Sequence, residues 1–315
     1  MTTRESKSST ENLVRYSLIL ERLRKFLARR GVIEVVTPVV TRNPSLEPTI
    51  DSVRLNEIFY LRTSPESALK QLVAMHGKDV FEIGPVFRAR ERGSLHLEQF
   101  SLLEYYRVGF DCDAMMDELA RLLEVLGWTE PVTKMSYHVL FTDVCGFNPY
   151  EICTESLYEL ASKQPIRLTA EESADRGFLF DIVNTHQIAR ELESFGMVFL
   201  YDFPKELRGY ARIHKLPTRA ARFELYLKGM EIANGYHEIT DPEEQRVVFE
   251  NENRIRRSRG KPEFLLDSGW LSALANGMPD CCGVAVGVER LLCGLLGKEE
   301  IRSVVSLPPP AGLPC

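Results

Sequence analysis

Apolar side chains recur with helical spacing near the start of the chain. Between residues 11 and 30 they stand three or four positions apart, at Leu13, Tyr16, Ile19, Leu23 and Phe26. This spacing predicts an amphipathic helix, and Gly31 provides its end. The apolar run 32–40 that follows predicts a strand, which Pro38 restricts to a sheet edge or to a strand terminus.

The rest of the chain alternates between helical and strand patterns. A proline and a glutamate near the start of 64–76 favour a helix there, because both residue types suit the first helical turn. Further helices are predicted at 113–126, 242–259 and 266–276, and a mostly helical stretch at 137–195. Strands are predicted at 54–61, 80–88, 100–107, 197–202 and 222–234, and a final strand and helix at 283–296. Strands in clusters with long helices between them predict a mostly antiparallel α+β domain.

Composition limits the class of protein. With 315 residues, 44% of them apolar, the chain can bury a large core. Its apolar runs are too short to cross a bilayer and residues 1–12 lack the apolar core of a secretory signal, so we expect a cytoplasmic protein without a membrane partner. The seven cysteines are odd in number and lack CxxC spacing, which predicts reduced thiols and neither a disulfide framework nor a zinc site.

The charge balance gives no general attraction to nucleic acid. The formal net charge is -6, and binding to a phosphate backbone requires a basic surface. A nucleic-acid or acidic partner would therefore need a local patch. Two stretches qualify, Arg88 with Arg90 and Arg92, and the basic run 254–261. The second is interpreted more simply as a solvated helix end.

The first constellation with chemical meaning is the segment 81–106, which has the pattern strand, charged loop, strand. Arg88 stands where the first strand ends and the charged loop (residues 89–99) begins. A guanidinium fixed at the end of a buried strand can stabilise the charge that grows on an α-phosphate during attack. An exposed hairpin with solvated charges is the alternative.

A second constellation lies in the segment 222–238. If Lys228-Gly229 forms a two-residue hairpin turn, residue 226 lies opposite 231. Glu224 and Glu231 then share one face of the sheet as diagonal neighbours, about 7 Å apart. Two carboxylates so placed favour a cation between them, and Mg²⁺ that enters on ATP phosphates is the usual one. The alternative is an acidic hairpin exposed to water.

Two other polar residues of this segment stand an odd number of positions after Glu231, so in a regular strand their side chains would point to the opposite face of the sheet. Asn234 and Glu238 reach the face of Glu231 only if a β-bulge, expected at Asn234-Gly235, re-aims the strand.

The third constellation is the segment 283–292, a strand interrupted by glycines that runs into a helix. Glycines in a strand often mark the close approach of a ligand or of another backbone, and Arg290 on the first helical turn can reach a phosphate. Tight packing alone would also explain the glycines. Separately, Glu66, Glu104 and Glu238 could form a pocket for a cationic amino acid, because an ammonium that leaves water must be paired. Surface placement remains the default for each of them.

Taken in order, these segments resemble the class II aminoacyl-tRNA synthetases. Pro38 falls in motif 1, residues 88–106 in motif 2 and residues 283–292 in motif 3. The lysyl-tRNA synthetase branch is the most similar, through 63–66, Phe87-Arg88, His96, Phe100, Leu103-Glu104, Tyr106 and 231–235. Within it, the segments 229–241 and 277–285 resemble the synthetase paralogs that modify elongation factor P.

The resemblance covers residues 11–307 and implies a fold and a division of the chain. It implies the class II synthetase catalytic fold, a six- or seven-stranded antiparallel sheet flanked by helices, in a homodimer. Residues 1–10 would be a flexible N-terminus and 308–315 a C-terminal tail. No anticodon-binding OB domain is expected, because about ten residues precede the first helix.

The resemblance also implies a role for each site residue. Contacts with ATP would come from Arg88, Ala89, Arg90, Glu91, His96, Leu97, Phe100, Glu224, Leu225, Gly287 and Arg290. Contacts with the amino acid would come from Ser64, Pro65, Glu66, Glu104, Tyr106, Glu231, Asn234, Glu238 and Ala285. Arg88 and Arg290 would act in catalysis on the α- and γ-phosphates, and Phe100 would stack on adenine. Glu224 and Glu231 would hold Mg²⁺.

Finer roles follow for the amino acid and for the acceptor. Glu66, Tyr106 and Glu238 would bind the side-chain ammonium, and Glu104 and Asn234 the reacting end. Without anticodon-type tRNA recognition, the expected acceptor is the ε-amine of a lysine on elongation factor P.

One pocket residue bears on the choice of amino acid. These paralogs have alanine at position 285 where tRNA synthetases have glycine, a change linked to a preference for (R)-β-lysine over lysine, and this chain has Ala285.

Several positions depart from the family pattern. Arg90 reverses a charge beside the expected adenine site, Leu97 removes a polar contact, and Gln99 keeps size but not charge. The stretch 205–210 replaces a small, polar segment in the substrate region. Two alternatives therefore stand beside the ligase reading. One is an adenylating ligase with another amino acid or acceptor, and the other is a nucleotide-binding pseudoenzyme.

Overall fold

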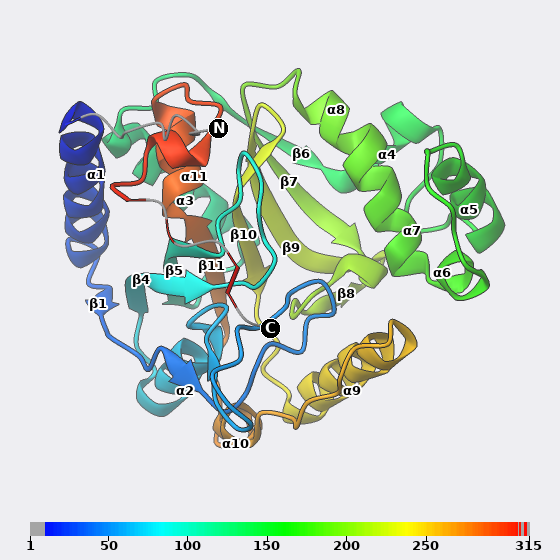
Figure 1. The fold of residues 1–315 in the computed structure, drawn as a ribbon, viewed down its shortest axis with the longest axis horizontal. Coiled ribbons are helices and arrows are strands. Elements are labelled where there is room, and N and C mark those ends of the chain that lie inside the picture. Colours follow the sequence, from blue (N-terminus) through cyan, green and yellow to red (C-terminus); the bar gives the residue numbers. More distant parts are fainter. Residues whose placement is uncertain (1–9, 308, 310–311, 314–315) are drawn as a thin grey trace. The chain divides into compact units, whose positions relative to one another are not determined.

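The computed structural model describes residues 10–307, 309 and 312–313, so the expected flexible N-terminus and most of the expected tail lie outside the described residues. The described chain forms two compact units (Figure 1). The first unit runs to Thr129 and resumes at Ile239, and the second spans Glu130–Glu238. Each unit is described by itself below.

The sheet of the first unit contains four strands in the order β1-β4-β5-β11. These are β1 (Ile33–Glu34), β4 (Val80–Phe87), β5 (Gln99–Val108) and β11 (Cys281–Gly287). β5 pairs antiparallel with β4 and with β11, while β1 pairs parallel with β4. The register places Glu104 of β5 between Glu82 of β4 and Ala285 of β11, so these three positions form one row across the sheet.

Helices flank this sheet (Figure 1). They are α1 (Thr10–Ala28), α2 (Glu66–His76), α3 (Cys112–Leu126), α9 (Pro242–Ser258), α10 (Ser268–Ala275) and α11 (Val288–Leu295), with a 3-10 turn at Ile301–Ser303. α1 packs on α3, and α2 packs on β4, β5 and α10. Local sequence explains the boundaries, since Asp111 caps α3 by accepting from the Ala114 N–H and Gly127 ends it in the left-handed region.

The second unit has five strands and a group of helices. Its strands are β6 (Val132–Ser136), β7 (Met197–Pro204), β8 (Ile213–Lys215), β9 (Thr218–Leu227) and β10 (Met230–His237). β9 pairs antiparallel with β7, β8 and β10, and β6 pairs parallel with β7.

The helices of the second unit pack with the sheet through one buried core that includes Tyr137, Phe141, Leu179, Phe180 and Val198. They are α4 (Tyr137–Cys145), α5 (Thr154–Ser162), α6 (Ala170–Ala174), α7 (Arg176–Val183), a π-helical turn (Asn184–Ile188), α8 (Ala189–Leu192) and a 3-10 turn (Lys205–Leu207).

The predicted helices and the mostly antiparallel α+β class are confirmed, but two predicted strands form only in part. Within 32–40 and 54–61 lie the two-residue strands β1 and β3 (Tyr60–Leu61). β1 lies at the sheet edge, as expected, and β3 pairs with β2 (Val40–Thr41) in a separate small sheet. The apolar run 32–40 is only partly buried, because Val32 is 3% exposed whereas Val36 is 91% and Val40 is 46% exposed. Four strands in one unit and five in the other exceed the six or seven expected, since the short β6 and β8 gave no signal in the sequence.

Two further expectations concern cysteines and membranes. The six cysteines in the described ranges are free thiols, as expected, and Cys315 lies outside those ranges. Over the same residues, none of the helices has both the length and the apolar character needed to cross a membrane.

Candidate functional site

The predicted site residues divide between the two units. Twelve positions from Ser64 to Tyr106, together with Ala285, Gly287 and Arg290, belong to the first unit. Glu224, Leu225, Glu231, Asn234 and Glu238 belong to the second.

Arg88 stands directly after β4, where the charged loop begins. Its Nε donates to the carbonyl of Thr63 at 3.3 Å, and its Nη1 lies 3.7 Å from Oε1 of Glu91. Its guanidinium carbon lies 5.2 Å from the centre of the Phe100 ring, within cation–π range. Arg88 is therefore held by neighbours while about a quarter of its side chain (24%) stays exposed.

The charged loop is fixed by backbone contacts on both sides. The Ala89 N–H donates to the Asp51 carbonyl at 2.7 Å, and the Arg88 N–H donates to the Glu98 carbonyl at 2.9 Å. Arg90 adopts a left-handed backbone conformation with φ of 66°, which turns its side chain toward Asp51 at 3.7 Å. The reversed charge at position 90 is thus accommodated by a carboxylate of the 45–52 loop.

Glu98 is a buried acceptor inside the charged loop. It is 3% exposed and accepts from the side chain of Arg92 and from the backbone N–H groups of Arg90, Gly312 and Leu313. The hydrogen bond from Arg92, followed by the backbone N–H groups, lowers the pKa of Glu98 to about 2. Glu98 is therefore ionised at neutral pH and joins the loop to the C-terminal segment, a role that its position in the sequence did not suggest.

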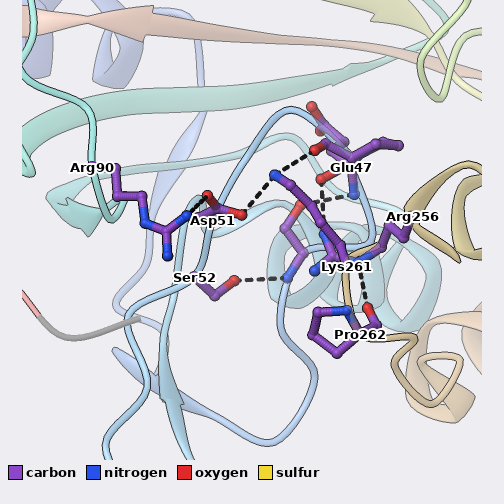
Figure 2. Close-up of polar contacts among 9 residues, drawn as sticks. Glu47, Asp51, Ser52, Arg90, Arg256, Lys261 and Pro262 are labelled. Carbon is purple, nitrogen blue, oxygen red and sulfur yellow. Dashed lines mark hydrogen bonds and ion pairs between the residues drawn. The ribbon is translucent and has the colours of Figure 1, made fainter. Parts of the chain in front are cut away.

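Asp51 connects the charged loop to the end of α9. Figure 2 shows Asp51 between Arg90 and Lys261, and Lys261 Nζ lies 2.8 Å from Asp51 Oδ1. Lys261 also donates to the Pro48 carbonyl at 2.8 Å. Arg256 is only 2% exposed and donates to the carbonyls of Glu47 and Pro262.

The expectation that the basic run 254–261 is a solvated helix end is accordingly wrong for Arg256 and Lys261. Both side chains donate hydrogen bonds to carbonyl and carboxylate oxygens of residues 45–52 and of the turn after α9. They hold the loop that in turn contacts the backbone at Ala89.

Arg290 lies on the first turn of α11, as predicted. It donates to the Leu95 carbonyl at 3.2 Å and to Nε2 of His96 at 2.8 Å, which accepts because a guanidinium can only donate. The preceding Glu289 points inward at 4% exposure and accepts from the Ser101 N–H and the Tyr16 hydroxyl. Burial raises the pKa of Glu289. This carboxylate joins α11 to β5 through the Ser101 N–H. The sequence analysis did not single it out, because beside Arg290 it resembles one member of an exposed charged pair.

Glu104 lies in the middle of β5 and is 3% exposed. The Tyr106 hydroxyl donates to its Oε1 at 2.7 Å, so the two residues share one face of the strand. Ala285 is Glu104's neighbour on β11 and is partly buried. The sheet thus brings together Glu104, Tyr106 and Ala285, three of the residues expected to contact the amino acid.

A buried ion pair that the sequence did not reveal lies in the same row. Arg62 Nη2 lies 2.8 Å from Oε1 of Glu82, with both side chains 4% exposed. Thr37 donates to Glu82 at 2.6 Å and accepts from Arg62 at 2.7 Å. Gly84 allows this arrangement, because a Cβ at that position would lie 2.6 Å from Arg62 Nη2. Arg62 therefore compensates the carboxylate that stands opposite Glu104.

Glu66 begins α2, directly after Pro65, as predicted. Its Oε1 accepts from Lys70 Nζ at 2.6 Å, and the side chains are 13% and 2% exposed. A carboxylate that was expected to receive a substrate ammonium already contacts an ammonium of its own chain. Lys70 was not singled out in the sequence, although a lysine four residues after a glutamate in a helix suggests such a pair.

In the second unit, the hairpin of β9 and β10 has the predicted turn at Lys228-Gly229, with Tyr226 opposite Glu231. Glu224 is 6% exposed and is contacted by the Arg222 guanidinium and by the Tyr226 hydroxyl. Burial raises the pKa of Glu224, Arg222 opposes this rise, and nearby Glu231 adds to it. Glu224 and Glu231 share one face of the hairpin, as the strand alternation predicted, but the Arg222 guanidinium lies on the same face and was not expected there.

A β-bulge in β10 changes which residues share that face. The register shifts between Glu231 and Ala233, so that Asn234 lies directly opposite Glu224. Arg222 Nε donates to Asn234 Oδ1 at 3.3 Å across the two strands. A β-bulge is present in this strand, as predicted, but it lies at Ile232 and not at Asn234-Gly235. Glu238 keeps the parity of Asn234 and is 1% exposed.

The carboxylates suit Mg²⁺ only in the form in which it accompanies ATP. Among the described residues no group of three or more His, Cys, Asp or Glu side chains could hold a metal. Mg²⁺ bound to phosphates keeps several waters and needs one or two carboxylates, which Glu224 and Glu231 would provide. Arg222 contacts one oxygen of Glu224 and Tyr226 donates to the other, and a carboxylate with about four acceptor sites can accept these contacts and still bind an ion.

Two predicted ATP contacts have side chains that do not face solvent. Leu97 is 4% exposed, and Leu225 is fully buried on the face of β9 opposite to Glu224. Gly287 lies at the start of α11, where an added Cβ would meet Arg290 only at 3.8 Å, an ordinary contact distance.

Comparison with known proteins shows which family this chain resembles. Residues 1–310 match the model of the class II tRNA synthetases (D, K and N). The chain is 34% identical over 319 residues to an elongation factor P--(R)-beta-lysine ligase of Proteus mirabilis, covering 96% of this chain and 97% of that protein. It is 33% identical over 313 residues to the Vibrio cholerae protein of the same name, with 96% and 97% coverage. The Yersinia enterocolitica protein of that name is 33% identical, with 94% of each chain covered.

Proposed function

Because the chain belongs to the class II tRNA synthetases of the D, K and N group, an ATP-using ligase family, we propose that it adenylates a lysine-like amino acid and transfers it to elongation factor P. The proposed amino acid is (R)-β-lysine or lysine, and the proposed acceptor is the ε-amine of a lysine on the factor. The names of the relatives above support (R)-β-lysine and elongation factor P, since these relatives match almost the whole length of this chain.

The observation that carries this proposal lies in the first unit. Arg88, braced by Thr63 and the Phe100 ring, offers a fixed cation for a phosphate. The same unit presents the carboxylates of Glu66 and Glu104, one with a lysine and the other with a tyrosine hydroxyl as partner. Phosphate-binding and ammonium-binding groups in one unit suit a substrate pair of ATP and a cationic amino acid.

The proposed first step is an in-line displacement. A carboxylate oxygen of the amino acid forms a bond to the α-phosphorus, and the bond to the bridging oxygen breaks to release pyrophosphate. Arg88 stabilises the charge that develops on the α-phosphate oxygens, and Arg290 is assigned to the γ-phosphate. Mg²⁺, proposed to be held by Glu224 and Glu231, would neutralise phosphate charge. No side chain becomes covalently modified, so the protein contributes position and charge.

The proposed second step needs only the acceptor. The lysine ε-amine attacks the carbonyl carbon of the adenylate, an amide bond forms, and AMP leaves while the amine loses a proton. Glu104 and Asn234 are assigned to the reacting end of the amino acid, and Glu66, Tyr106 and Glu238 to its side-chain ammonium.

The test is pyrophosphate exchange with lysine, (R)-β-lysine and the other amino acids, followed by mass spectrometry of elongation factor P. We expect exchange with a lysine-like amino acid and a mass increase of one residue on the factor. Exchange without a mass increase would point to another acceptor. Absence of exchange with every amino acid, together with measurable ATP binding, would identify a nucleotide-binding protein without turnover.

We also propose a homodimer, which exposed apolar side chains at the start of the first unit support. Leu13, Val14 and Leu18 of α1 are 40%, 54% and 43% exposed, and Ile33 of β1 is 49% exposed. Side chains of this kind favour burial against a second copy. Sedimentation velocity should give the dimer mass for the wild type and the monomer mass for Val14→Glu. A monomeric wild type would contradict the proposal.

A further inference from the structure

We propose that Lys70 is a positioning residue that holds Glu66 in place for the ammonium of the amino-acid substrate. The inference rests on the proposed function, because it assumes that Glu66 contacts the substrate. It adds a residue outside the predicted site, together with the part of the fold that supports it.

The ion pair between Lys70 and Glu66 is nearly removed from water. Lys70 is 2% exposed, and its Nζ lies 2.6 Å from Glu66 Oε1. A buried ammonium is unfavourable unless it is paired and a carboxylate is held against it. The Glu66 carboxylate therefore offsets part of the cost of burying Lys70, and each side chain of the pair restrains the other.

An aromatic ring also contacts Lys70. Its Nζ lies 4.4 Å from the centre of the Trp270 ring, so the ammonium contacts both a carboxylate and an aromatic ring. Trp270 is itself held edge-on by Phe249 of α9, with ring centres 5.1 Å apart at 83°. The position of Glu66 is thus set by α10 and α9 as well as by its own helix.

Polar contacts join α2 to α10 next to this pair. Ser67 donates to Asp267 Oδ2 at 2.5 Å, and Gln71 donates to Ser67 Oγ at 3.1 Å. Asp267 also caps α10 by accepting from the Trp270 N–H at 3.0 Å. Gly269 allows this close approach, because a Cβ there would lie 3.0 Å from Gln71 Oε1. α2 therefore begins on a rigid support, and Glu66 is its first residue.

This geometry leaves Glu66 able to bind a second cation. A carboxylate has two oxygens and about four acceptor sites, and the contact with Lys70 uses Oε1. A substrate ammonium at Oε2 would find the carboxylate already oriented, so little ordering remains to be done on binding. Loss of Lys70 should therefore weaken amino-acid binding and leave ATP binding unchanged.

The chain contains a matched control for this pair. Lys25 contacts Glu21 at 2.5 Å with the same four-residue helical spacing, but these side chains are 61% and 52% exposed. The chemistry and spacing of the two pairs agree, and they differ in burial.

The experiment is steady-state pyrophosphate exchange with the full chain and the amino acid that the wild type activates best. We expect Lys70→Met to raise the KM for the amino acid about tenfold or more, with the KM for ATP within about twofold of the wild type. Lys70→Arg, which keeps the cation, should recover most of the affinity. Lys25→Met should match the wild type. A Lys70→Met variant with an unchanged amino-acid KM would overturn the inference.

A double variant separates positioning from general loss of structure. Glu66→Gln with Lys70→Met removes both charges of the pair. If Lys70 acts through Glu66, the double variant should have the same amino-acid KM as Glu66→Gln alone, whereas additive effects would contradict this route. Absence of exchange in the wild type would contradict the proposed function itself, which keeps the two failures distinguishable.

Discussion

The start of α2 and the charged loop both hold carboxylates with cations, yet the two regions differ in exposure. At α2 the lysine and the glutamate are 2% and 13% exposed. At the loop, Arg90 is 70% exposed where it meets Asp51, and Arg92 is 51% exposed where it meets Glu98. The same chemistry therefore serves a fixed element at the proposed amino-acid end and a more adjustable one at the proposed nucleotide end.

This difference teaches that counting ion pairs does not rank their importance. An exposed pair contributes little because water and salt screen it, while removal of one partner from a buried pair leaves a charge without solvation. Glu98 lies between these extremes, since a buried carboxylate is paired with an exposed arginine and with backbone N–H groups.

The largest effect is expected at α2. Glu66→Leu removes the carboxylate that lies 2.6 Å from the buried Lys70 ammonium, and should lower the free energy of unfolding by about 3–5 kcal/mol. Urea denaturation followed by circular dichroism measures this change. The double variant Glu66→Leu with Lys70→Leu should regain most of the loss. A single-variant loss below about 1 kcal/mol would mean that the two regions do not differ as described.

An intermediate effect is expected at Glu98. Glu98→Gln keeps the shape of the side chain but removes the charge that Arg92 and the backbone N–H groups of Arg90 and Gly312 contact. We expect a loss of about 1.5–3 kcal/mol in the free energy of unfolding and a higher KM for ATP. Glu300→Gln, an exposed glutamate, is the control and should leave both quantities unchanged.

The contribution of Glu98 should also depend on pH in one direction. Its pKa is lowered from 4.5 to about 2 in the folded chain, so the unfolded state takes up a proton first as the pH falls. The stabilisation is complete above about pH 4.5 and is lost as the pH falls toward 2. The difference in unfolding free energy between wild type and Glu98→Gln should shrink across this window. A constant difference would show that the charge is not the cause.

The smallest effect is expected at Asp51. Asp51→Asn removes contacts with Arg90 and Lys261 that are partly open to solvent, but keeps the carbonyl that accepts from Ala89. The loss should stay below about 1 kcal/mol and should disappear in high salt. Thermal unfolding at low and high salt measures it. An effect as large as that of Glu66→Leu would remove the contrast between the two regions.

Local signals in the sequence predicted the elements that carry the site. Pro65 and Glu66 predicted the start of α2, and the parity of Glu224 and Glu231 around the turn at Lys228-Gly229 predicted a shared face. These inferences succeed because helical and strand periods are set by nearby residues.

The supporting residues could not be predicted in this way. Trp270 reaches Lys70 from a helix two hundred positions away, and Lys261 reaches Asp51 over a similar separation. Glu98 contacts Gly312 at the far end of the chain. Such contacts depend on tertiary packing, which leaves no periodic mark on the sequence. The apolar residues around Val36 predicted a longer strand than the one that forms, because Val36 is exposed and its apolar character does not reflect burial within a sheet.

The bulge at Ile232 has a consequence for how this activity is traced among genomes. The alternation of side chains between the two faces of β10 is interrupted there, because the pairing register with β9 shifts between Glu231 and Ala233. The extra residue lets Glu231 and Asn234, which stand three positions apart, share one face of the hairpin. In a chain that lacks Ile232 but keeps both residues, they would stand two positions apart and would share that face by ordinary strand alternation. One residue fewer between these positions in a distant chain is therefore no reason to deny it this chemistry, whereas the same spacing in a strand without the bulge would turn Asn234 away from Glu224.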